Sequence, residues 1–500
     1  MTVTSKQMLH SIADIKRYFA ENEARYYFIS ATNFNLMGMH EWVRGWQDIN
    51  MLDCFDGSHP RVEIVADDHT IQFESIEGIN AYLLNSPQVH ALLSDRKIKG
   101  TARGRAIFLF FNEQLESICQ ALDIDIILPK FSLVHEIDSK IVTTEIGNQA
   151  GVHSVPNVLT KVSSYENLCQ IARNAGLGER WVVQTSHGDS GKTTFFIANK
   201  TDYQVFASKI EAEEMVKVMR WIKCTGSAIE ACATRWGTVV GPLLSEMIGI
   251  DSLTPYPGGW CGNELYDDAF SNDLRRQVQR KTQAIGDVLY RRGYRGYFEL
   301  DFLIDLDTGD IYLGELNARI TGISAMTNMS DFSIGHIPLF LFHLLEYDTE
   351  VDLSLDIDGF NQTVLAEGAQ GTASQVILNV TVKEMSIITR APVSGVYTMD
   401  TGGQLSLKQA GYNRREAMAE NECYVLRIMK TGECTYKGAG LAIMFMNCRI
   451  CGPQGKLNRI GEQWVGALKG CFQYRELNKQ ERSEMQTGTN SVNTLSEHKQ

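Results

Sequence analysis

The chain has 500 residues, of which 44% are hydrophobic and 21% are charged, and its formal net charge is −13. This composition excludes collagen-like, disordered and small disulfide-stapled proteins, and the length predicts roughly three domains at about 150 residues each. The negative charge disfavours a general binder of nucleic acid or of anionic membranes, because both functions need a basic surface.

Residues 1–137 are predicted to form an α/β domain with a parallel sheet. The apolar runs that predict strands are 26–31, 62–66, 106–111 and 125–128. The segment 113–122 has helical spacing, and an alternation of strands with helices is typical of a parallel sheet covered by helices. No GxGxxG motif follows the first strand, so a dinucleotide site has little support.

Residues 138–350 have a different pattern of predicted strands, helices and turns and are predicted to form a second unit. The predicted strands are 181–185, 193–198, 296–304 and 310–316, and the predicted helices are 140–150 and 274–292. The long helix carries one apolar stripe and ends at Gly293. A glycine-rich turn joins the first two strands, and a polar turn joins the last two.

Residues 351–478 are predicted to form a mostly β third domain, because short strand-like runs alternate with glycine-rich turns. The predicted strands are 374–382, 394–399, 422–429 and 442–446. Residues 479–500 are polar and without periodicity, so we expect a disordered tail.

The last two predicted strands of the second unit carry four polar residues that are expected to lie close together. If their hairpin folds about Thr308, residues equidistant from Thr308 face each other, which places Asp301 opposite Glu315 and Glu299 opposite Asn317. Side chains alternate between the faces of a strand with period two, so all four project to one face. Opposed Cβ atoms are then about 4.5–5.5 Å apart.

Opposed carboxylates repel each other unless a cation lies between them. Carboxylate oxygens on adjacent strands suit Mg²⁺, which prefers them together with phosphate oxygens and water; an exposed polar face with a few acids is the alternative. Apolar residues dominate both strands, which favours buried acids and a metal site. Arg319, two residues after Asn317, would neutralise charge on a transferring phosphoryl group or form a salt bridge to one of the acids.

The glycine-rich turn at 188–192 is not a Walker A motif. Such a motif requires glycine five residues before Gly191, where this chain has Ser186, and it opens a helix, whereas β-branched and aromatic residues follow Lys192. The small residues Gly188 and Ser190 can still bring backbone N–H groups to a phosphate. An ordinary hairpin turn is the alternative.

These segments resemble the ATP-grasp superfamily of carboxylate–amine ligases, which includes the biotin carboxylases. The resemblance covers residues 138–345 in detail, and it implies an N-terminal parallel α/β (pre-ATP-grasp) domain and a C-terminal, mostly β domain around the ATP-grasp region. The most specific match is the pattern Asp301-Phe302-Leu303 … Gly314-Glu315-Leu316-Asn317-Ala318-Arg319. It implies that Asp301, Glu315 and Asn317 are metal ligands and that Arg319 is a catalytic residue at the reacting phosphate.

The resemblance also implies residues that bind the nucleotide. Lys140, at the head of a helix, resembles the first nucleotide-binding lysine of the superfamily, and the turn 188–192 resembles the loop that closes over the triphosphate. A later segment resembles the linker whose backbone contacts the adenine edge and the strand after it, with Arg220, Trp221, Ile222 and Glu230. A buried strand without ligand contact is the alternative for each residue of the linker.

One position departs from the superfamily pattern. A second lysine usually ends the strand before the glycine-rich loop, and this chain has Gln184 there. Glutamine can hydrogen-bond to a phosphate oxygen or to adenine but carries no charge. Either Lys192 supplies the charge from the loop, or the affinity for the nucleotide is lower.

The chemistry implied by the resemblance is that of a ligase dependent on ATP and on Mg²⁺ or Mn²⁺. A small-molecule carboxylate would attack the γ-phosphorus to give an acyl phosphate and ADP, and an amine would then displace phosphate to form an amide or peptide bond. Two alternatives stay open: carboxylation of the biotin-carboxylase type with bicarbonate, and a regulatory protein that binds ATP without turnover, which Gln184 favours. A homodimer is a common outcome in this superfamily.

We expect a cytoplasmic protein without nucleic-acid or membrane partners. The N-terminus lacks the basic and apolar stretches of a signal peptide, and the apolar run 337–345 is shorter than the about 20 residues that span a bilayer. The 11 cysteines are scattered, as in reduced cytosolic chains. Cys448 and Cys451 have metal-ligand spacing without a second pair, which favours strand or turn thiols over zinc.

A further glycine-rich segment, 257–263, lies between the linker and the long helix. Its flexibility suits a lid that covers the substrate. A surface connection is the alternative.

Overall fold

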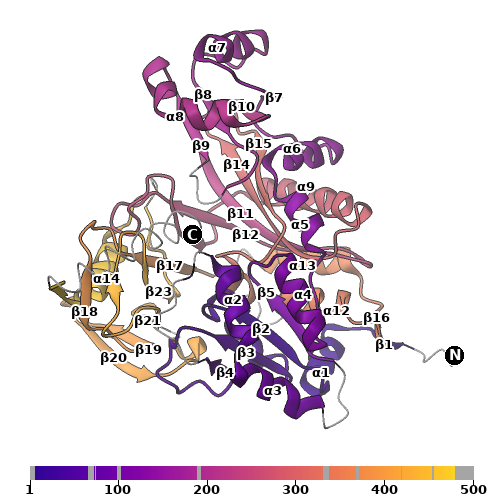
Figure 1. The fold of residues 1–500 in the computed structure, drawn as a ribbon, viewed down its shortest axis with the longest axis vertical. Helices are drawn as coiled ribbons and strands as arrows, with labels where there is room; N and C mark the ends of the chain where they lie inside the picture. The colour runs from indigo at the N-terminus through magenta and orange to yellow at the C-terminus, as the bar shows by residue number, and fades with distance from the viewer. Residues whose placement is uncertain are drawn as a thin grey trace.

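The computed structural model describes residues 6–65, 73, 75–97, 103–188, 193–329, 337–367, 371–417, 419–452 and 455–478. The expected tail at 479–500 and the candidate phosphate-binding residues Ser190, Gly191 and Lys192 lie outside these residues. Figure 1 shows three regions: an N-terminal α/β unit, a small lobe at the top of the view, and a long sheet that runs from the centre into the C-terminal half.

The N-terminal unit is built on a five-stranded parallel sheet, as predicted. Its strand order is β4-β3-β2-β5-β6. The strands are β2 (Tyr26–Ser30), β3 (Trp46–Asn50), β4 (Val62–Ile64), β5 (Arg105–Phe108) and β6 (Asp125–Ile126), and the helices are α1 (Ile12–Glu21), α2 (Ile76–Asn85), α3 (Pro87–Lys97), α4 (Glu113–Leu122) and α5 (Phe131–Ile137). Helix α4 begins where the Asn112 side chain accepts a hydrogen bond from Leu115 N, and it buries Leu115 and Cys119.

The small lobe is a four-stranded sheet covered on one face by two helices (Figure 1). Its strand order is β7-β10-β8-β9. The strands are β7 (Asn157–Thr160), β8 (Trp181–Gln184), β9 (Thr194–Ile197) and β10 (Val216–Arg220), the covering helices are α7 (Tyr165–Asn174) and α8 (Lys200–Ala212), and α6 (Lys140–Gln149) precedes the lobe. One side-chain cluster joins the two covering helices to this sheet.

The third region is built on a ten-stranded sheet, in the order β15-β14-β11-β12-β13-β17-β23-β21-β19-β20. Its strands are β11 (Cys224–Thr234), β12 (Gly237–Ile248), β13 (Trp260–Leu265), β14 (Gly296–Asp305), β15 (Ile311–Asn317), β17 (Ala373–Asn379), β19 (Gly395–Met399), β20 (Leu405–Ala410), β21 (Glu422–Arg427) and β23 (Gly440–Met446). Five strands after residue 351 therefore continue the sheet that carries the central hairpin, namely β17, β19, β20, β21 and β23.

The remaining elements are helices and short strands, and these strands form a two-stranded sheet and a three-stranded sheet. They are β1 (Gln7–Leu9), α9 (Asn272–Arg291), α10 (Ser324–Met329), α12 (Phe340–Glu346), β16 (Val351–Leu353), α13 (Ile357–Glu367), β18 (Ser386–Arg390), β22 (Cys434–Thr435), α14 (Arg459–Gly470) and β24 (Gln473–Glu476). The predicted long helix is α9, which begins with the Ser271 side chain as its cap and packs Val278, Ile285 and Leu289 into the core. This amphipathic stripe is the one that the sequence predicts.

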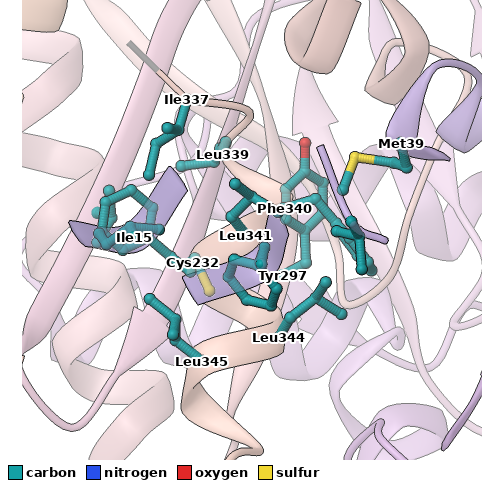
Figure 2. Packing of buried hydrophobic residues seen from close by; sticks show 14 of the residues in the cluster. Ile15, Met39, Cys232, Tyr297, Ile337, Leu339, Phe340, Leu341, Leu344 and Leu345 are labelled. Carbon is teal, nitrogen blue, oxygen red and sulfur yellow. The ribbon is translucent and has the colours of Figure 1, made fainter. Parts of the chain in front are cut away.

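A shared hydrophobic core fixes the N-terminal unit to the central sheet. Ile15 from α1, Cys232 from β11, Tyr297 from β14 and Phe340 from α12 meet in one cluster (Figure 2). The apolar run 337–345 is thus interior packing. Within the described part of the chain, no helix is both long and apolar enough to cross a bilayer.

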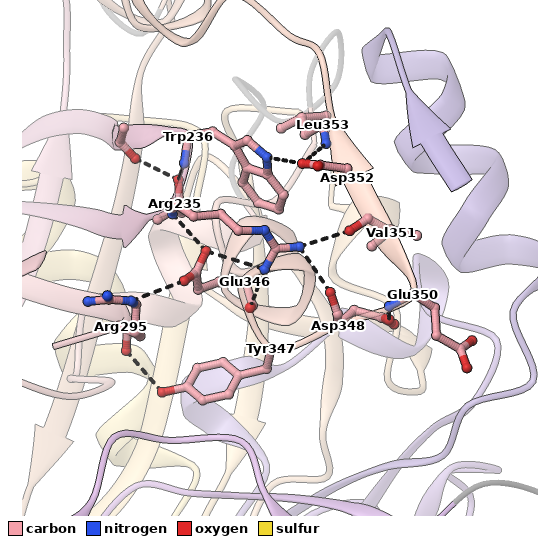
Figure 3. Close-up of polar contacts among 12 residues, drawn as sticks. Arg235, Trp236, Arg295, Glu346, Tyr347, Asp348, Glu350, Val351, Asp352 and Leu353 are labelled. Atoms are coloured by element: carbon pink, nitrogen blue, oxygen red, sulfur yellow. Dashed lines mark hydrogen bonds and ion pairs between the residues drawn. The ribbon is translucent and has the colours of Figure 1, made fainter. Parts of the chain in front are cut away.

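A polar network reinforces this junction. The Arg235 guanidinium donates to the carbonyl oxygens of Glu346, Asp348 and Val351, at 2.6, 3.0 and 2.9 Å (Figure 3). Glu346 also pairs with Arg295 at 3.4 Å. The turn between β11 and β12 is therefore tied to the segment that leads from α12 to β16.

Asp48 in β3 gives the N-terminal unit a predicted dependence on pH. Burial raises the pKa of its carboxyl to about 7, against the hydrogen bonds from Trp46 and Asn33, which lower it. A raised carboxyl pKa means stability that is complete below the ordinary value near 3.8 and is lost as pH rises through about 7. At about pH 8 the loss is on the order of 4 kcal/mol at most.

Asp48→Asn should therefore raise the free energy of unfolding at about pH 8 and leave it nearly unchanged at about pH 4. The new amide also has a partner, because Asn33 Oδ1 is buried without a hydrogen bond among the described residues and can accept one after an amide flip. Thermal melts across pH measure this. The half-exposed Asp125 of the same sheet is the matched control, and equal pH slopes for wild type and Asp48→Asn would contradict the prediction.

Candidate active site

The hairpin of β14 and β15 brings the predicted acids face to face. Asp301 pairs with Glu315, and Glu299 pairs with Asn317, as the sequence predicts. Nearer the turn the predicted register is wrong by one residue, since Phe302 pairs with Leu313 and leaves Gly314 in a bulge. The turn is centred between Asp307 and Thr308, half a residue before the expected centre, and the bulge restores the predicted register at the acids.

Mutual repulsion and burial dominate the electrostatics of these acids. The pKa of Asp301 rises to about 7, first because the group is buried and then because Glu315 faces it. The pKa of Glu299 lies well above its usual range, through burial and the charge of Asp301. A cluster of this kind is a strong attractor for a cation.

Glu246, on β12, joins the cluster from a third strand. Burial and the charges of Asp301 and Glu315 hold its pKa well above the ordinary value. The Glu246 carboxylate lies over Gly226 of the neighbouring strand β11, where a Cβ would come within 2.4 Å of Glu246 Oε2. Only glycine at this position lets the carboxylate approach the hairpin.

Two cations lie at this site, one in contact with an acid of the pair and one in contact with Asn317. Lys140 Nζ lies 2.8 Å from Glu315 Oε1 and donates to the carbonyl oxygen of Gly188 at 2.7 Å. Arg319 donates to Asn317 Oδ1, lies 3.4 Å from Asp138 Oδ1, and stacks over the Phe110 ring at 5.0 Å from its centre. The predicted lysine, arginine, asparagine and acids are therefore gathered in one place.

The donor set fits a hard divalent cation that also binds phosphate. Asp301 and Glu315 supply carboxylates from adjacent strands, and Asn317 supplies an amide oxygen, which Arg319 contacts. In the described ranges, no three His, Cys, Asp or Glu side chains are arranged to hold a metal by themselves. Mg²⁺ is commonly bound by one or two carboxylates plus phosphate oxygens, so a nucleotide would complete this set.

The start of the glycine-rich turn adjoins Lys140. Gly188 has φ +139°, and a Cβ there would lie 2.2 Å from Thr193 Cγ2, so the close approach requires glycine. The carbonyl oxygen of Ser186 accepts from Lys140 N at 2.7 Å. The head of α6 and the end of β8 are thereby fastened together beside the acids.

The predicted linker leaves the small lobe between β10 and β11. Arg220 is exposed and donates to the carbonyl oxygen of Gly176 at 3.1 Å, and Arg180 stacks on Trp221 at 3.8 Å from the ring centre. Trp221 and Ile222 border an apolar cluster that joins the lobe to the hairpin. Its other members are Val155, Val182, Met219, Leu303 and Tyr312.

Glu230 lies on β11, the strand after the linker, and both of its carboxylate oxygens are occupied by protein hydroxyls. Thr321 and Ser324 donate to Oε1, and Tyr297 donates to Oε2. Burial raises the pKa of Glu230 to about 7. Its contacts hold the segment that follows Arg319 against the central sheet.

Sequence reasoning missed Glu246 and Lys217 at this site. Each is a lone charged residue inside an otherwise apolar stretch of strand, and that isolation is the signal that could have identified them. Lys217 is fully buried on β10 and donates to Ser154 Oγ at 3.0 Å.

Two further buried amides were missed, Asn263 in the glycine-rich segment 257–263 and Gln375 on β17. Residues 260–263 belong to strand β13 and are neither a lid nor a surface connection, whereas 257 and 258 lie in an exposed turn before this strand. Asn263 lies opposite both Glu246 and Gln375. Its Nδ2 and Gln375 Oε1 are buried without a hydrogen bond in the described part of the structure. Glu246, Asn263 and Gln375 thus form a row of polar side chains on three neighbouring strands, beginning at the acid cluster.

Comparison with known proteins identifies the fold. Neither a family model nor a curated protein matches the sequence. The biotin carboxylase domain of 2-oxoglutarate carboxylase from Hydrogenobacter thermophilus, solved with MgADP, ADP and bicarbonate, is similar with a TM-score of 0.58 at 11% identity, over 92% of each chain. Biotin carboxylase from Campylobacter jejuni, a β-γ-ATP complex, has a TM-score of 0.58 at 12% identity, over 94% of this chain and 97% of that one.

Phosphoribosylamine–glycine ligase from Thermotoga maritima has a TM-score of 0.52 at 11% identity, over 90% of this chain and 98% of that one. These similar structures are ATP-grasp enzymes, and the match spans both the parallel N-terminal sheet and the large antiparallel sheet. The chain therefore has the ATP-grasp fold.

Proposed function

We propose that this chain, which has the ATP-grasp fold, is an ATP- and Mg²⁺-dependent ligase that joins a small carboxylate to an amine and releases ADP and phosphate. One observation carries the proposal: Asp301 and Glu315 face each other across β14 and β15. Lys140 contacts one of these acids, and the charge of Arg319 lowers the pKa of the other. The reported biotin carboxylases were solved with ADP or a form of ATP, which supports a nucleotide here.

The metal ligands we propose are Asp301, Glu315 and Asn317. When bound there, Mg²⁺ or Mn²⁺ would offset the negative charge of the phosphates. Lys140 would bind a phosphate oxygen and exchange part of its contact with Glu315 for it. Arg319, held by Asn317 and Asp138, would stabilise the charge that develops on the γ-phosphoryl group.

The remaining predicted residues would hold the rest of the nucleotide. The backbone from Gly188 to Lys192 would lie over the phosphates, and Gln184 would donate a hydrogen bond to the nucleotide. Adenine would lie between the lobe and the hairpin, against the apolar cluster bordered by Trp221 and Ile222. The contacts of Glu230 support a positioning role, because protein hydroxyls occupy both oxygens.

The reaction would proceed in two displacements. A carboxylate oxygen attacks the γ-phosphorus, the bond to the β–γ bridging oxygen breaks, and ADP leaves an acyl phosphate behind. The amine nitrogen then attacks the acyl carbon, phosphate departs, and the nitrogen loses a proton. The protein contributes positioning, charge stabilisation and exclusion of water, so no protein nucleophile is required.

A second candidate function is carboxylation of the biotin-carboxylase type, in which bicarbonate is the activated acid. Two of the similar structures are biotin carboxylases, one of them solved with bicarbonate, and this likeness is the observation that favours the second function. The Hydrogenobacter thermophilus domain was solved as a dimer, and we extend a homodimer to this chain as part of the proposal.

Release of ADP and phosphate over a panel of acids and amines separates these functions. The ligase predicts release that requires an acid and an amine together, with one amide formed per ADP. Release with bicarbonate and no amine would establish the second function. Tight ATP binding without release on any pair would contradict both and favour a regulatory protein.

A further inference from the structure

Lys217 lies on the face of the small lobe that is turned away from α7 and α8. Along β10 its neighbours Val216 and Val218 pack into the cluster that includes residues of α7 and α8. Side chains alternate between the two faces of a strand, so Lys217 projects to the opposite face. Met219 shares this face and belongs to the apolar cluster that joins the lobe to the hairpin.

The ammonium group of Lys217 is buried without a carboxylate in contact. The residue is 0% exposed, and among the described residues its Nζ has one hydrogen bond, to Ser154 Oγ at 3.0 Å. Burial lowers its pKa to about 7; the charge of Glu315 raises the pKa, and the charge of Lys140 lowers it further. An unpaired buried cation is costly to the folded protein, so a role in packing alone explains it poorly.

The residue directly opposite Lys217 is Gln184, the position that lacks the expected lysine. Gln184 Nε2 donates to Thr194 Oγ1 at 3.1 Å, while its Oε1 is buried without a partner in the described ranges. Directly opposed side chains have Cβ atoms about 4.5–5.5 Å apart. A lysine at 217 can therefore place its charge close to where a lysine at 184 would have placed it.

We propose that Lys217 binds the phosphate chain of ATP from the small lobe and supplies the positive charge that Gln184 lacks. This inference rests on the proposed nucleotide site. Lys217 lies near enough to Glu315 and Lys140 for their charges to affect it, which places it beside the group that would hold the phosphates. ATP would thus be bound between Lys140, at the head of α6, and Lys217, on β10.

The test is the affinity of the full chain for Mg-ATP, measured by calorimetry. Lys217→Met should weaken binding about 10- to 100-fold, since a contact with a charged group is lost. Lys217→Gln, which keeps a donor for Ser154, should lose as much. Lys161→Met, at an exposed lysine of the same lobe, should bind as wild type does. Adding Gln184→Lys to Lys217→Met should restore most of the affinity.

The outcomes distinguish this inference from the proposed function. Wild-type chain that fails to bind Mg-ATP would overturn the nucleotide site itself. If the wild-type chain binds Mg-ATP and either Lys217→Met or Lys217→Gln binds it with an affinity within twofold of wild type, only the role of Lys217 is overturned. If Lys217→Met does not fold, Lys217→Gln decides alone. Loss of affinity that Gln184→Lys cannot restore would assign Lys217 to packing, because a structural role depends on its position and not on its charge.

Discussion

Asp301→Asn should lower the rate of ATP-dependent product formation by about 10³-fold or more. The change keeps the shape of the side chain and removes one of two facing negative charges. The folded protein itself should lose nothing, because burial and Glu315 already raise the pKa of Asp301 to about 7. Initial rates at saturating ATP and a thermal melt of the same sample measure both effects.

The matched control is Asp307→Asn, in the exposed turn of the same hairpin. It makes the same chemical change outside the acid cluster and should leave the rate within about twofold. Asp301→Asn with activity within tenfold of wild type would contradict the role of the acid pair. A large loss of rate together with a lower melting temperature would point instead to damage of the fold.

Arg319→Met should reduce kcat by about 10²- to 10³-fold, with a much smaller change in KM for ATP. The reason is that the guanidinium would meet charge that develops only as the phosphoryl group transfers. Asn317, Asp138 and the Phe110 ring hold it in one orientation. Arg319→Lys should also lose most of the activity, because an ammonium group lacks the planar fork.

The control for this prediction is Arg276→Lys, at an exposed arginine on α9. A purely structural role for Arg319 has a different signature. The variant would then be less stable, and kcat would fall only in proportion to the folded fraction. A kcat that returns to within about twofold of the wild-type value after correction for the folded fraction would therefore contradict a catalytic role.

Local sequence patterns were sufficient to predict the central hairpin. A hairpin folded about Thr308 placed Asp301 opposite Glu315, which the register confirms, and the period of two placed both side chains on one face. The bulge at Gly314 was not predictable, because it depends on the offset of the turn. Helix α9 was predicted from its apolar stripe, and the parallel N-terminal sheet from the alternation of strands with helices; both are confirmed.

Contacts between distant strands could not be predicted in the same way. Lys217 and Gln184 are opposite each other only because β10 pairs directly with β8, although β9 and α8 separate the two strands in the sequence. Glu246 reaches the hairpin only because β11 lies between β12 and β14 and carries glycine at 226. A single sequence does not determine the order of strands in a sheet, so the proximity of these residues to the acids could not be predicted.

The most direct test of the account is a crystal of the full chain with Mn²⁺ and a non-hydrolysable ATP analogue, measured for anomalous scattering. The account predicts a manganese peak about 2.2 Å from oxygen atoms of Asp301 and Glu315 and in contact with the phosphates. A nucleotide bound elsewhere, or bound here with its metal away from both carboxylates, would contradict it.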